Sequence, residues 1–169
     1  MNTLTINGAD YEPSDEELGL TLMRYLREKR FLRGTKNGCE QGLCGTCTVV
    51  VDGKPLRSCR SSVEKNLGKS IITIEGMEYP DGSLHPIQRA FLDSGAVQCG
   101  FCTPGMVMSS YALLLREPAP DREAIRKALR GNLCRCTGYQ QIVDAVELAS
   151  RIMREQDLPV EAGCLAHDR

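Results

Sequence analysis

Nine cysteines are the chemically reactive residues of this chain of 169 residues, which contains only two histidines. Eight of them form two sets of four, and the ninth, Cys164, stands alone near the end. The first set is a C-x4-C-x2-C run followed, after eleven intervening residues, by a fourth cysteine: Cys39, Cys44, Cys47 and Cys59. The second set combines C-x2-C with C-x-C: Cys99, Cys102, Cys134 and Cys136. Sets of four thiols with almost no histidine indicate sulfur-only sites for zinc or for iron–sulfur clusters.

The spacing of the first set favours iron. Structural zinc sites usually combine two C-x2-C pairs, or C-x2-C with H-x3-H, whereas C-x4-C-x2-C is the spacing of plant-type [2Fe–2S] clusters. Four glycines are interleaved with these cysteines in residues 34–47. Glycine lets the backbone adopt positive φ and come close to an inorganic core, where N–H groups can donate to sulfur. The second set, taken alone, is compatible with either zinc or iron.

Composition and charge argue against several classes of protein: nucleic-acid-binding, membrane-spanning and secreted. The chain has 21 Lys and Arg against 22 Asp and Glu, so no basic surplus points to nucleic acid. No apolar stretch approaches the roughly 18 residues of a membrane-spanning helix. Residues 1–7 lack the charged and apolar regions of a secretory signal. We therefore expect a cytoplasmic location, where clustered thiols bind metal more often than they form disulfides.

Residues 1–77 are expected to form a β-grasp, ferredoxin-like [2Fe–2S] domain. Ser14 and Glu17 form a capping box that begins a helix carrying Leu18, Leu22 and Leu26. The turn dipeptides Asn7-Gly8 and Asp52-Gly53 predict two hairpins. Strands are expected at residues 4–6, 9–12, 48–51, 56–59 and 70–74. Strands wrapped around one helix are typical of this fold, and the fold class is α+β.

Residues 78–156 are expected to form an all-α four-helix bundle, after a linker at 76–82. Helices are predicted over 84–92, 103–116, 121–129 and 139–153, with Thr103 and Asp121 as N-caps. The second cysteine set then lies in the loops before the second helix and between the third and fourth. Residues 157–169 form a tail that we expect to be mobile or bound to a partner.

Three motifs resemble those of the iron–sulfur subunit of molybdenum hydroxylases, the xanthine oxidase family. They read Gly-Leu-Cys-Gly-Thr-Cys-Thr at 42–48, Gln-Cys-Gly-Phe-Cys-Thr-Pro-Gly at 98–105 and Gly-Asn-Leu-Cys-Arg-Cys-Thr-Gly-Tyr at 131–139. The resemblance covers residues 1–155 approximately, with the motifs in the same order and all eight clustered cysteines at matching positions. Residues from Gln156 onward fall outside it.

The resemblance implies two [2Fe–2S] clusters, one on each cysteine set. It places the second cluster near the molybdenum pterin of a large partner subunit, with Gln98 and Cys136 close to that cofactor. It also implies that electrons released during hydroxylation of an N-heterocycle or aldehyde, with oxygen from water, pass to a flavin (FAD) subunit or another acceptor. We expect the glycine-lined first cluster to be the more exposed one and to pass electrons onward. The chain has no G-x-G-x-x-G dinucleotide motif of its own.

Two other functions are compatible with parts of the pattern: a free-standing [2Fe–2S] carrier or sensor, and a zinc-stapled interaction module. Arg135 could tune a cluster or meet a pterin phosphate, but the simpler expectation is a solvated or partner-facing arginine. His85 is expected to be a capping or surface residue. Cys164 and His167 do not make a site by themselves. The substrate pocket would lie on the large subunit, so this chain does not specify the substrate.

Overall fold

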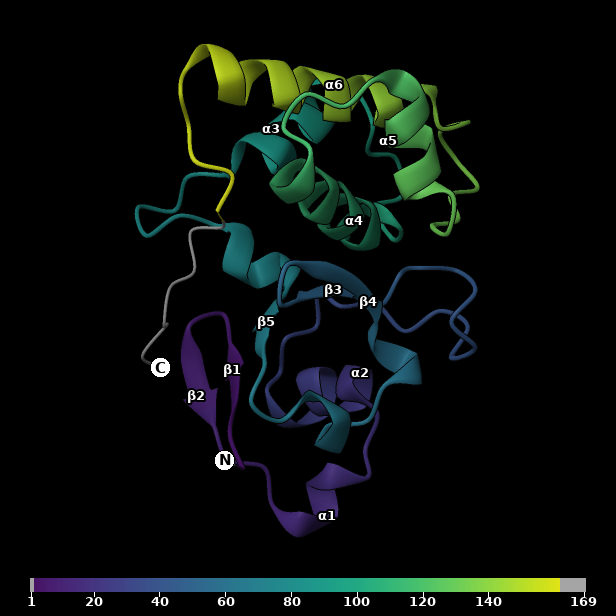
Figure 1. Ribbon diagram of the computed structural model, residues 1–169. Coiled ribbons are helices and arrows are strands. Elements are labelled where there is room, and N and C mark those ends of the chain that lie inside the picture. Colours follow the sequence, from purple (N-terminus) through teal and green to yellow (C-terminus); the bar gives the residue numbers. More distant parts are fainter. Residues whose placement is uncertain (1, 162–169) are drawn as a thin grey trace.

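The computed structural model describes residues 2–161 and divides into a sheet half and a helical half (Figure 1). The five strands are β1 (Leu4–Ile6), β2 (Ala9–Tyr11), β3 (Thr48–Val51), β4 (Lys54–Arg57) and β5 (Ser70–Ile72). They form one sheet in the order β2-β1-β5-β3-β4. The β1–β5 pair is parallel and the other pairs are antiparallel. This is the expected mixed sheet of a ferredoxin-like half.

Both predicted hairpin turns are confirmed. Asn7 and Gly8 have φ values of 50° and 84°, and Asp52 and Gly53 have values of 47° and 76°. Positive φ at both central residues is the type I′ geometry whose twist matches that of the flanking strands. The tight turn makes Lys54 pair directly with Val51. For that reason β4 covers 54–57 and not the expected 56–59.

The expected single helix after Ser14 is interrupted. It consists of α1 (Asp15–Leu18), α2 (Leu22–Arg24) and a π-helical segment, Tyr25–Lys29. Ser14 N–H donates to the Glu17 carboxylate at 3.0 Å, as a capping box requires. The break follows because Thr21 acts as a second N-cap and accepts from Arg24 N–H at 3.3 Å. Leu22 and Leu26 still pack into the core under the sheet, as their spacing predicted.

Short 3-10 helices replace two of the predicted strand ends. Residues Ser58–Arg60 form one, so Cys59 lies in a tight turn after β4. Glu64–Asn66 forms a second, and Ile74–Met77 forms a third directly after β5. The last segment leads into the helical half, and it ends the predicted strand at Ile72 and not at Ile74.

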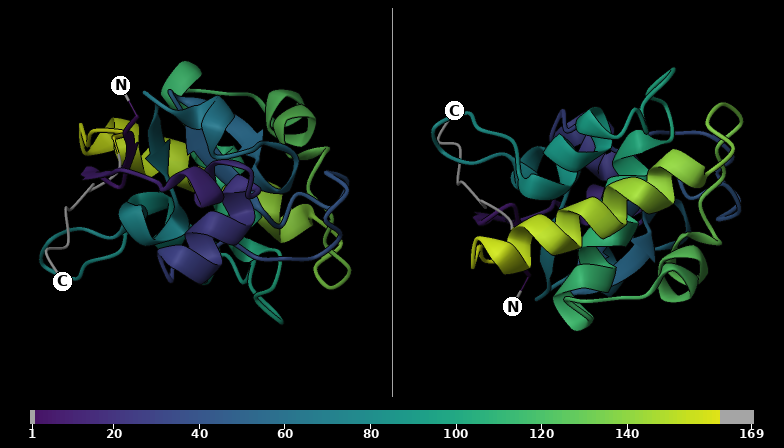
Figure 2. Two further views of the ribbon diagram at one scale, coloured as in Figure 1. Left: turned by 90° about the horizontal axis from the view of Figure 1, so that it is seen from below. Right: turned by 90° about the horizontal axis from the view of Figure 1, so that it is seen from above.

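The helical half contains the four predicted helices: α3 (Pro86–Asp93), α4 (Thr103–Arg116), α5 (Arg122–Leu129) and α6 (Gln140–Glu155). Helix α4 is buried along most of its length because it packs against α3, α5 and strand β3. Seen from above in Figure 2, α6 runs across the helical half and packs on α3. The Asp121 cap is confirmed, since its carboxylate accepts from Ala124 N–H at 2.7 Å. The N-cap of α4 is Cys102, one residue before the expected Thr103.

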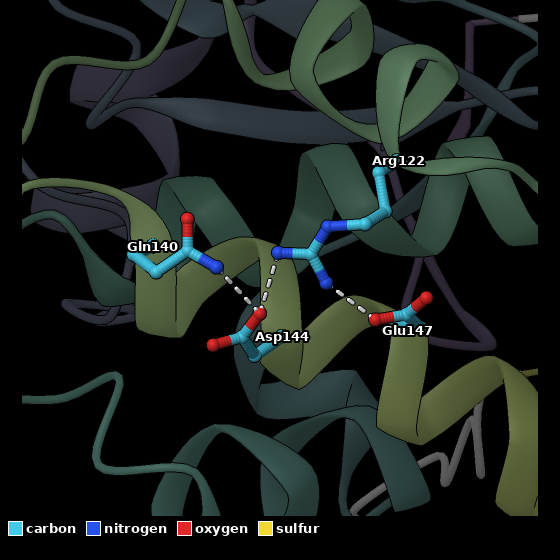
Figure 3. Close-up of polar contacts among 4 residues, drawn as sticks. All are labelled: Arg122, Gln140, Asp144 and Glu147. Atoms are coloured by element: carbon cyan, nitrogen blue, oxygen red, sulfur yellow. Dashed lines mark hydrogen bonds and ion pairs between the residues drawn. The ribbon is translucent and has the colours of Figure 1, made fainter.

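An exposed polar cluster joins α5 to α6 (Figure 3). The Arg122 guanidinium contacts the Asp144 carboxylate at 2.6 Å and also pairs with Glu147. Gln140 donates to the same Asp144 oxygen at 3.0 Å. These contacts connect the two helices that flank the loop carrying Cys134 and Cys136.

His85 is a buried capping residue. Its Nδ1 accepts from Ile87 N–H at 3.2 Å, and its other ring nitrogen lies 3.2 Å from the Val160 carbonyl oxygen. The capping part of the expectation is confirmed and the surface part is wrong, because the side chain is fully buried. Because His85 caps the helix, α3 begins at Pro86 and not at residue 84.

Residues 157–161 follow α6 back over the helical half. Leu158 and Val160 pack against its core. The expectation that residues 157–169 are mobile or bound to a partner stays a prediction, because most of this tail lies outside the described residues. Cys164 and His167 lie outside the described residues. Within residues 2–161, no helix combines the length and the apolar character needed to cross a bilayer.

Candidate metal centres

The first cysteine set gathers at one end of the sheet. Cys39, Cys44 and Cys47 lie on the loop that leads into β3, and Cys59 reaches them from the 3-10 turn after β4. Cys47 and Cys59 are buried and pack against Met23 of α2, whereas Cys39 and Cys44 are half-buried. The loop therefore supplies three of the thiols, and the turn after the β3–β4 hairpin supplies the fourth from a separate segment, as the spacing predicted.

The thiols of this set experience opposite electrostatic environments. Cys39 Sγ accepts from the backbone N–H groups of Cys44 and Gln41, both at 3.4 Å. These hydrogen bonds, led by the one from Cys44, lower the pKa of Cys39 to about 6. Burial, with a contribution from the thiol of Cys47, raises the pKa of Cys59 to about 11. The Thr46 hydroxyl also lies 3.2 Å from Cys44 Sγ.

Glycine is required in this loop for two reasons. Gly42 and Gly45 have φ values of 76° and 74°, in the left-handed region that favours glycine. A Cβ on Gly45 would also lie 2.6 Å from the Gly131 carbonyl oxygen. The loop therefore both curls tightly and approaches the helical half closely.

The second set lies on the loops around α4 and α6. Cys99 and Cys102 precede α4, while Cys134 and Cys136 lie between α5 and α6. Cys99 Sγ and Cys136 Sγ are 3.6 Å apart. Burial raises the pKa of Cys102 to about 12, and the neighbouring Cys134 thiol adds to the rise. Burial also acts to raise the pKa of Cys134, but hydrogen bonds from Thr137, the Cys136 backbone and the Cys102 thiol together outweigh it, so the net shift is downward.

The donor chemistry of both sets fits a [2Fe–2S] cluster. Each set offers four thiols, and in each the thiols interact as two pairs: Cys39 with Cys44, Cys47 with Cys59, Cys99 with Cys136, and Cys102 with Cys134. A two-iron cluster held by four cysteines takes two thiolates on each iron. Within residues 2–161, no group of three Cys, His, Asp or Glu side chains is arranged around one point as for a single metal ion.

The exposure of the two sets is the reverse of our expectation. Cys47 and Cys59 are 2% and 5% exposed, whereas Cys99 and Cys136 are both exposed. The first loop folds back against α2 and β3, while the second set lies in loops at the surface of the helical half. Within this chain, the first centre is therefore the more covered one.

The residues beside the second set lie on the same surface. Gln98 and Arg135 are both exposed, so Arg135 has the solvent-facing position that we expected. Phe101 and Leu133 are 47% and 56% exposed. This surface presents apolar and polar side chains around the second set, and nothing within the described residues covers it.

One cavity joins the two sets. It has a volume of about 230 Å³ and is lined by Cys44 of the first set and all four cysteines of the second. Phe101 and Leu133 also line it. Cys44 is thus the part of the first set that lies nearest to the second. Sequence spacing predicted the two sets of cysteines but carried no information about the approach of one set to the other.

Sequence reasoning missed the residues that hold the two sets together. Asn132, which is 2% exposed, donates to the Gly45 carbonyl at 3.2 Å and so reaches the loop of the first set. Arg57 at the end of β4 donates to the Gly131 carbonyl at 2.7 Å. Gly131 and Asn132 belong to the third motif, which was the available signal, but a motif does not reveal contacts across 74 and 87 residues.

The fold and the two cysteine sets together define a protein with two [2Fe–2S] domains. Two family models agree: one described as a 2Fe-2S iron-sulfur cluster binding domain matches residues 15–89, and one described as a [2Fe-2S] binding domain matches residues 73–147. The small subunit of nicotine 6-hydroxylase from Paenarthrobacter nicotinovorans is 50% identical over 126 residues, which are 75% of this chain and 75% of that protein.

Two further proteins are similar to this chain over most of their own length. The small FeS subunit of nicotinate dehydrogenase from Eubacterium barkeri is 43% identical over 152 residues, 88% of this chain and 96% of that protein. A chain in the crystal structure of quinoline 2-oxidoreductase from Pseudomonas putida 86 superposes with a TM-score of 0.81 at 42% identity, covering 90% of this chain and 94% of that one. The chain belongs to the family of small iron–sulfur subunits of molybdenum hydroxylases. It is an electron-transfer subunit of an oxidoreductase, and the free-standing carrier is not favoured.

Proposed function

We propose that this chain holds one [2Fe–2S] cluster on each cysteine set and relays single electrons between a large molybdenum-pterin subunit and a flavin subunit or another acceptor. The first site uses Cys39, Cys44, Cys47 and Cys59, and the second uses Cys99, Cys102, Cys134 and Cys136. The observation that carries the proposal is the cavity shared by Cys44 and the whole second set, because two redox sites in series must approach each other within one chain.

The large subunit is proposed to cover the second site. Cys99, Cys136 and Gln98 are exposed there, and Phe101 and Leu133 present apolar surface beside them. Partly exposed apolar side chains grouped around an open site are characteristic of a surface that a partner buries. Gln98 and Cys136 are proposed as the residues closest to the pterin cofactor of that subunit.

The proposal also covers the substrate class, the domain limits and the cellular location. The relatives that are separate small subunits are named for nicotine and nicotinate, so we propose an N-heterocycle as the substrate of the complex. An aldehyde is the alternative, because an aldehyde oxidoreductase from Megalodesulfovibrio gigas is 41% identical. We propose domain limits of 1–77 and 78–156, supported by the 3-10 helix that ends at Met77. A reducing cytoplasm is proposed because clustered cysteines bind metal there more often than they form disulfides.

When bound, a [2Fe–2S] cluster accepts and releases one electron at a time. The chain tunes that chemistry through burial and hydrogen bonding. Around the first set, the N–H groups of Gln41 and Cys44 point at Cys39 Sγ and favour added negative charge. Around the second set, the Thr137 hydroxyl lies 3.2 Å from Cys134 Sγ. These different surroundings should give the two sites different reduction potentials.

Redox titration followed by EPR tests the proposal. The loaded chain should show two distinct [2Fe–2S] signals that appear at different potentials, together with equal amounts of iron and acid-labile sulfide. A colourless preparation that contains zinc, or a single signal at full iron loading, contradicts it. Purification of the native complex should recover a molybdenum-containing large subunit.

A further inference from the structure

A buried polar seam connects the loop of the first site to the segment that carries Cys134. Asn132 lies at its centre and is 2% exposed. Its amide nitrogen donates to the Gly45 carbonyl at 3.2 Å, and its amide oxygen accepts from the Ser109 hydroxyl of α4 at 2.9 Å. Arg57 reaches the same oxygen at 3.3 Å. One side chain thus bonds to the first loop, to α4 and to the β4 arginine.

The backbone on either side of Asn132 completes the seam. Leu133 N–H donates to the Cys44 carbonyl at 2.8 Å. Cys44 belongs to the first set, and Leu133 directly precedes Cys134 of the second. Two ligand-bearing segments, 90 residues apart in the chain, are therefore joined by a single main-chain hydrogen bond. The exposed Leu133 side chain takes no part in this link.

Glycines let the segments approach so closely. A Cβ on Gly105 of α4 would clash with the Gly45 carbonyl oxygen, and a Cβ on Gly45 would crowd Gly131. Gly45 lies next to Cys44, and Gly105 lies three residues after Cys102. Any side chain at Gly105 would push the first loop away from α4 and from the second set.

We propose that this seam, centred on Asn132, sets the separation of the two redox sites and supplies the shortest bonded route between them. The route runs from Cys134 through the Leu133 N–H and the Cys44 carbonyl to Cys44. With clusters bound, this route would serve a one-electron transfer in which the second site is oxidised as the first is reduced, without a bond forming or breaking and without a proton moving. Asn132 is a positioning residue, because it touches neither set directly. The inference rests on the proposed function.

The test compares Asn132→Ala with Asn66→Ala in the full-length chain carrying both clusters. Asn66 is a matched control: it is also buried and hydrogen-bonded through its side-chain amide, which donates two bonds, but only within the sheet half. Two measurements are made on each variant. The first is the magnetic splitting between the two reduced clusters in low-temperature EPR, which falls steeply with their separation. The second is hydrogen exchange, by mass spectrometry, of peptides covering residues 131–134.

Asn132→Ala should reduce or abolish the splitting while both EPR signals remain. Loss of the buried partner should also make exchange at residues 131–134 about tenfold faster. Asn66→Ala should change neither. Unchanged splitting in folded Asn132→Ala overturns the inference, as does an equal loss in Asn66→Ala, which would reflect general loosening.

A second pair of variants keeps the test decisive if Asn132→Ala does not fold. Gly105→Ala should reduce the splitting through the clash with Gly45. Gly19→Ala should not, because the added Cβ at that position meets no atom within 4 Å. A splitting unaffected by Gly105→Ala contradicts the inference. Failure of the proposed function is a different result, because the wild-type chain would then lack two [2Fe–2S] signals.

Discussion

The eight clustered thiols differ in how readily they give up a proton. Backbone N–H groups lower the pKa of Cys39 to about 6, whereas burial raises the pKa of Cys59 to about 11 and that of Cys102 to about 12. Metal binding requires thiolates. Each set therefore combines at least one thiol that ionises readily with one whose burial opposes its charge until a cation is present.

Removal of one buried thiol should empty one site only. Cys59→Ala should halve the iron content of the chain and abolish the EPR signal of the first site, because the other set lies on separate loops. Cys164→Ala is the control, since Cys164 belongs to neither set, and it should keep full iron content. Loss of both signals in Cys59→Ala would show that the two sites are not independent.

His85 should make stability depend on pH. Burial lowers its pKa to about 4, from an ordinary value of 6.5, because a charged ring would lie among Tyr79, Tyr111 and the buried helix start. The unfolded chain therefore binds the proton first as pH falls. Unfolding free energy should decrease by about 1.4 kcal/mol for each pH unit below 6.5, down to about pH 4, and be unaffected above 6.5.

Urea unfolding at pH 7.5 and 5.5 measures this dependence. His85→Gln is the comparison, because an amide can accept the Ile87 N–H bond without titrating. Lowering the pH from 7.5 to 5.5 should reduce the unfolding free energy of the wild type more than that of His85→Gln. An equal pH dependence in both proteins would assign the effect to other groups.

At the scale of elements, local sequence signals predicted which helices, strands and turns form, whereas tertiary contacts determined where each of them begins and ends. The turn dipeptide at Asp52-Gly53 and the Asp121 cap act within a few residues, so both were readable from the sequence. The interruption after α1 was not, because Thr21 is also tied to Ser62 by an isolated bridge. The burial of His85 depends on Val160, 75 residues away. The Asn132 seam likewise joins segments that no local pattern relates.

The turn after β5 holds the start of the first cysteine loop. The Glu75 carboxylate accepts from Gly34 N–H at 2.7 Å and from the Thr73 hydroxyl at 2.6 Å, and both contacts are partly buried. Gly34 begins the segment that carries Cys39, Cys44 and Cys47. The 3-10 helix at Ile74–Met77 therefore does more than connect the two halves, because it also fixes one end of the first site.

Glu75→Ala should destabilise the first site selectively. It leaves a partly buried N–H without its partner, at a cost of about 1–3 kcal/mol in unfolding free energy. The EPR signal of the first site should bleach earlier than that of the second during storage or mild denaturation. Glu78→Ala, which removes an exposed carboxylate nearby, serves as the control. Simultaneous loss of both signals would mean that Glu75 supports the whole fold.

At the scale of the whole molecule, the two sites face different surroundings. The first set is partly enclosed by its own loop, α2 and β3, while Cys99 and Cys136 of the second set lie at the surface. A redox site left open in the isolated chain is consistent with burial by another subunit.

The isolated chain should therefore lose iron from the second site first. A water-soluble chelator added to the free chain should remove the second-site EPR signal before the first, because its thiols are accessible. In the native complex the second-site signal should be protected. Faster loss from the first site in the free chain would show that exposure of the thiols does not control access to the iron.

The parallel pairing of β1 with β5 has a consequence for biosynthesis. Leu4–Ile6 and its central neighbour in the sheet, Ser70–Ile72, are separated by some 60 residues of chain, so their pairing waits several seconds of translation at ordinary elongation rates. Until then the two hairpins have no common core. The cysteine loop at 39–47 is translated before β5, so the sheet that borders the first site is completed only after this loop has been made.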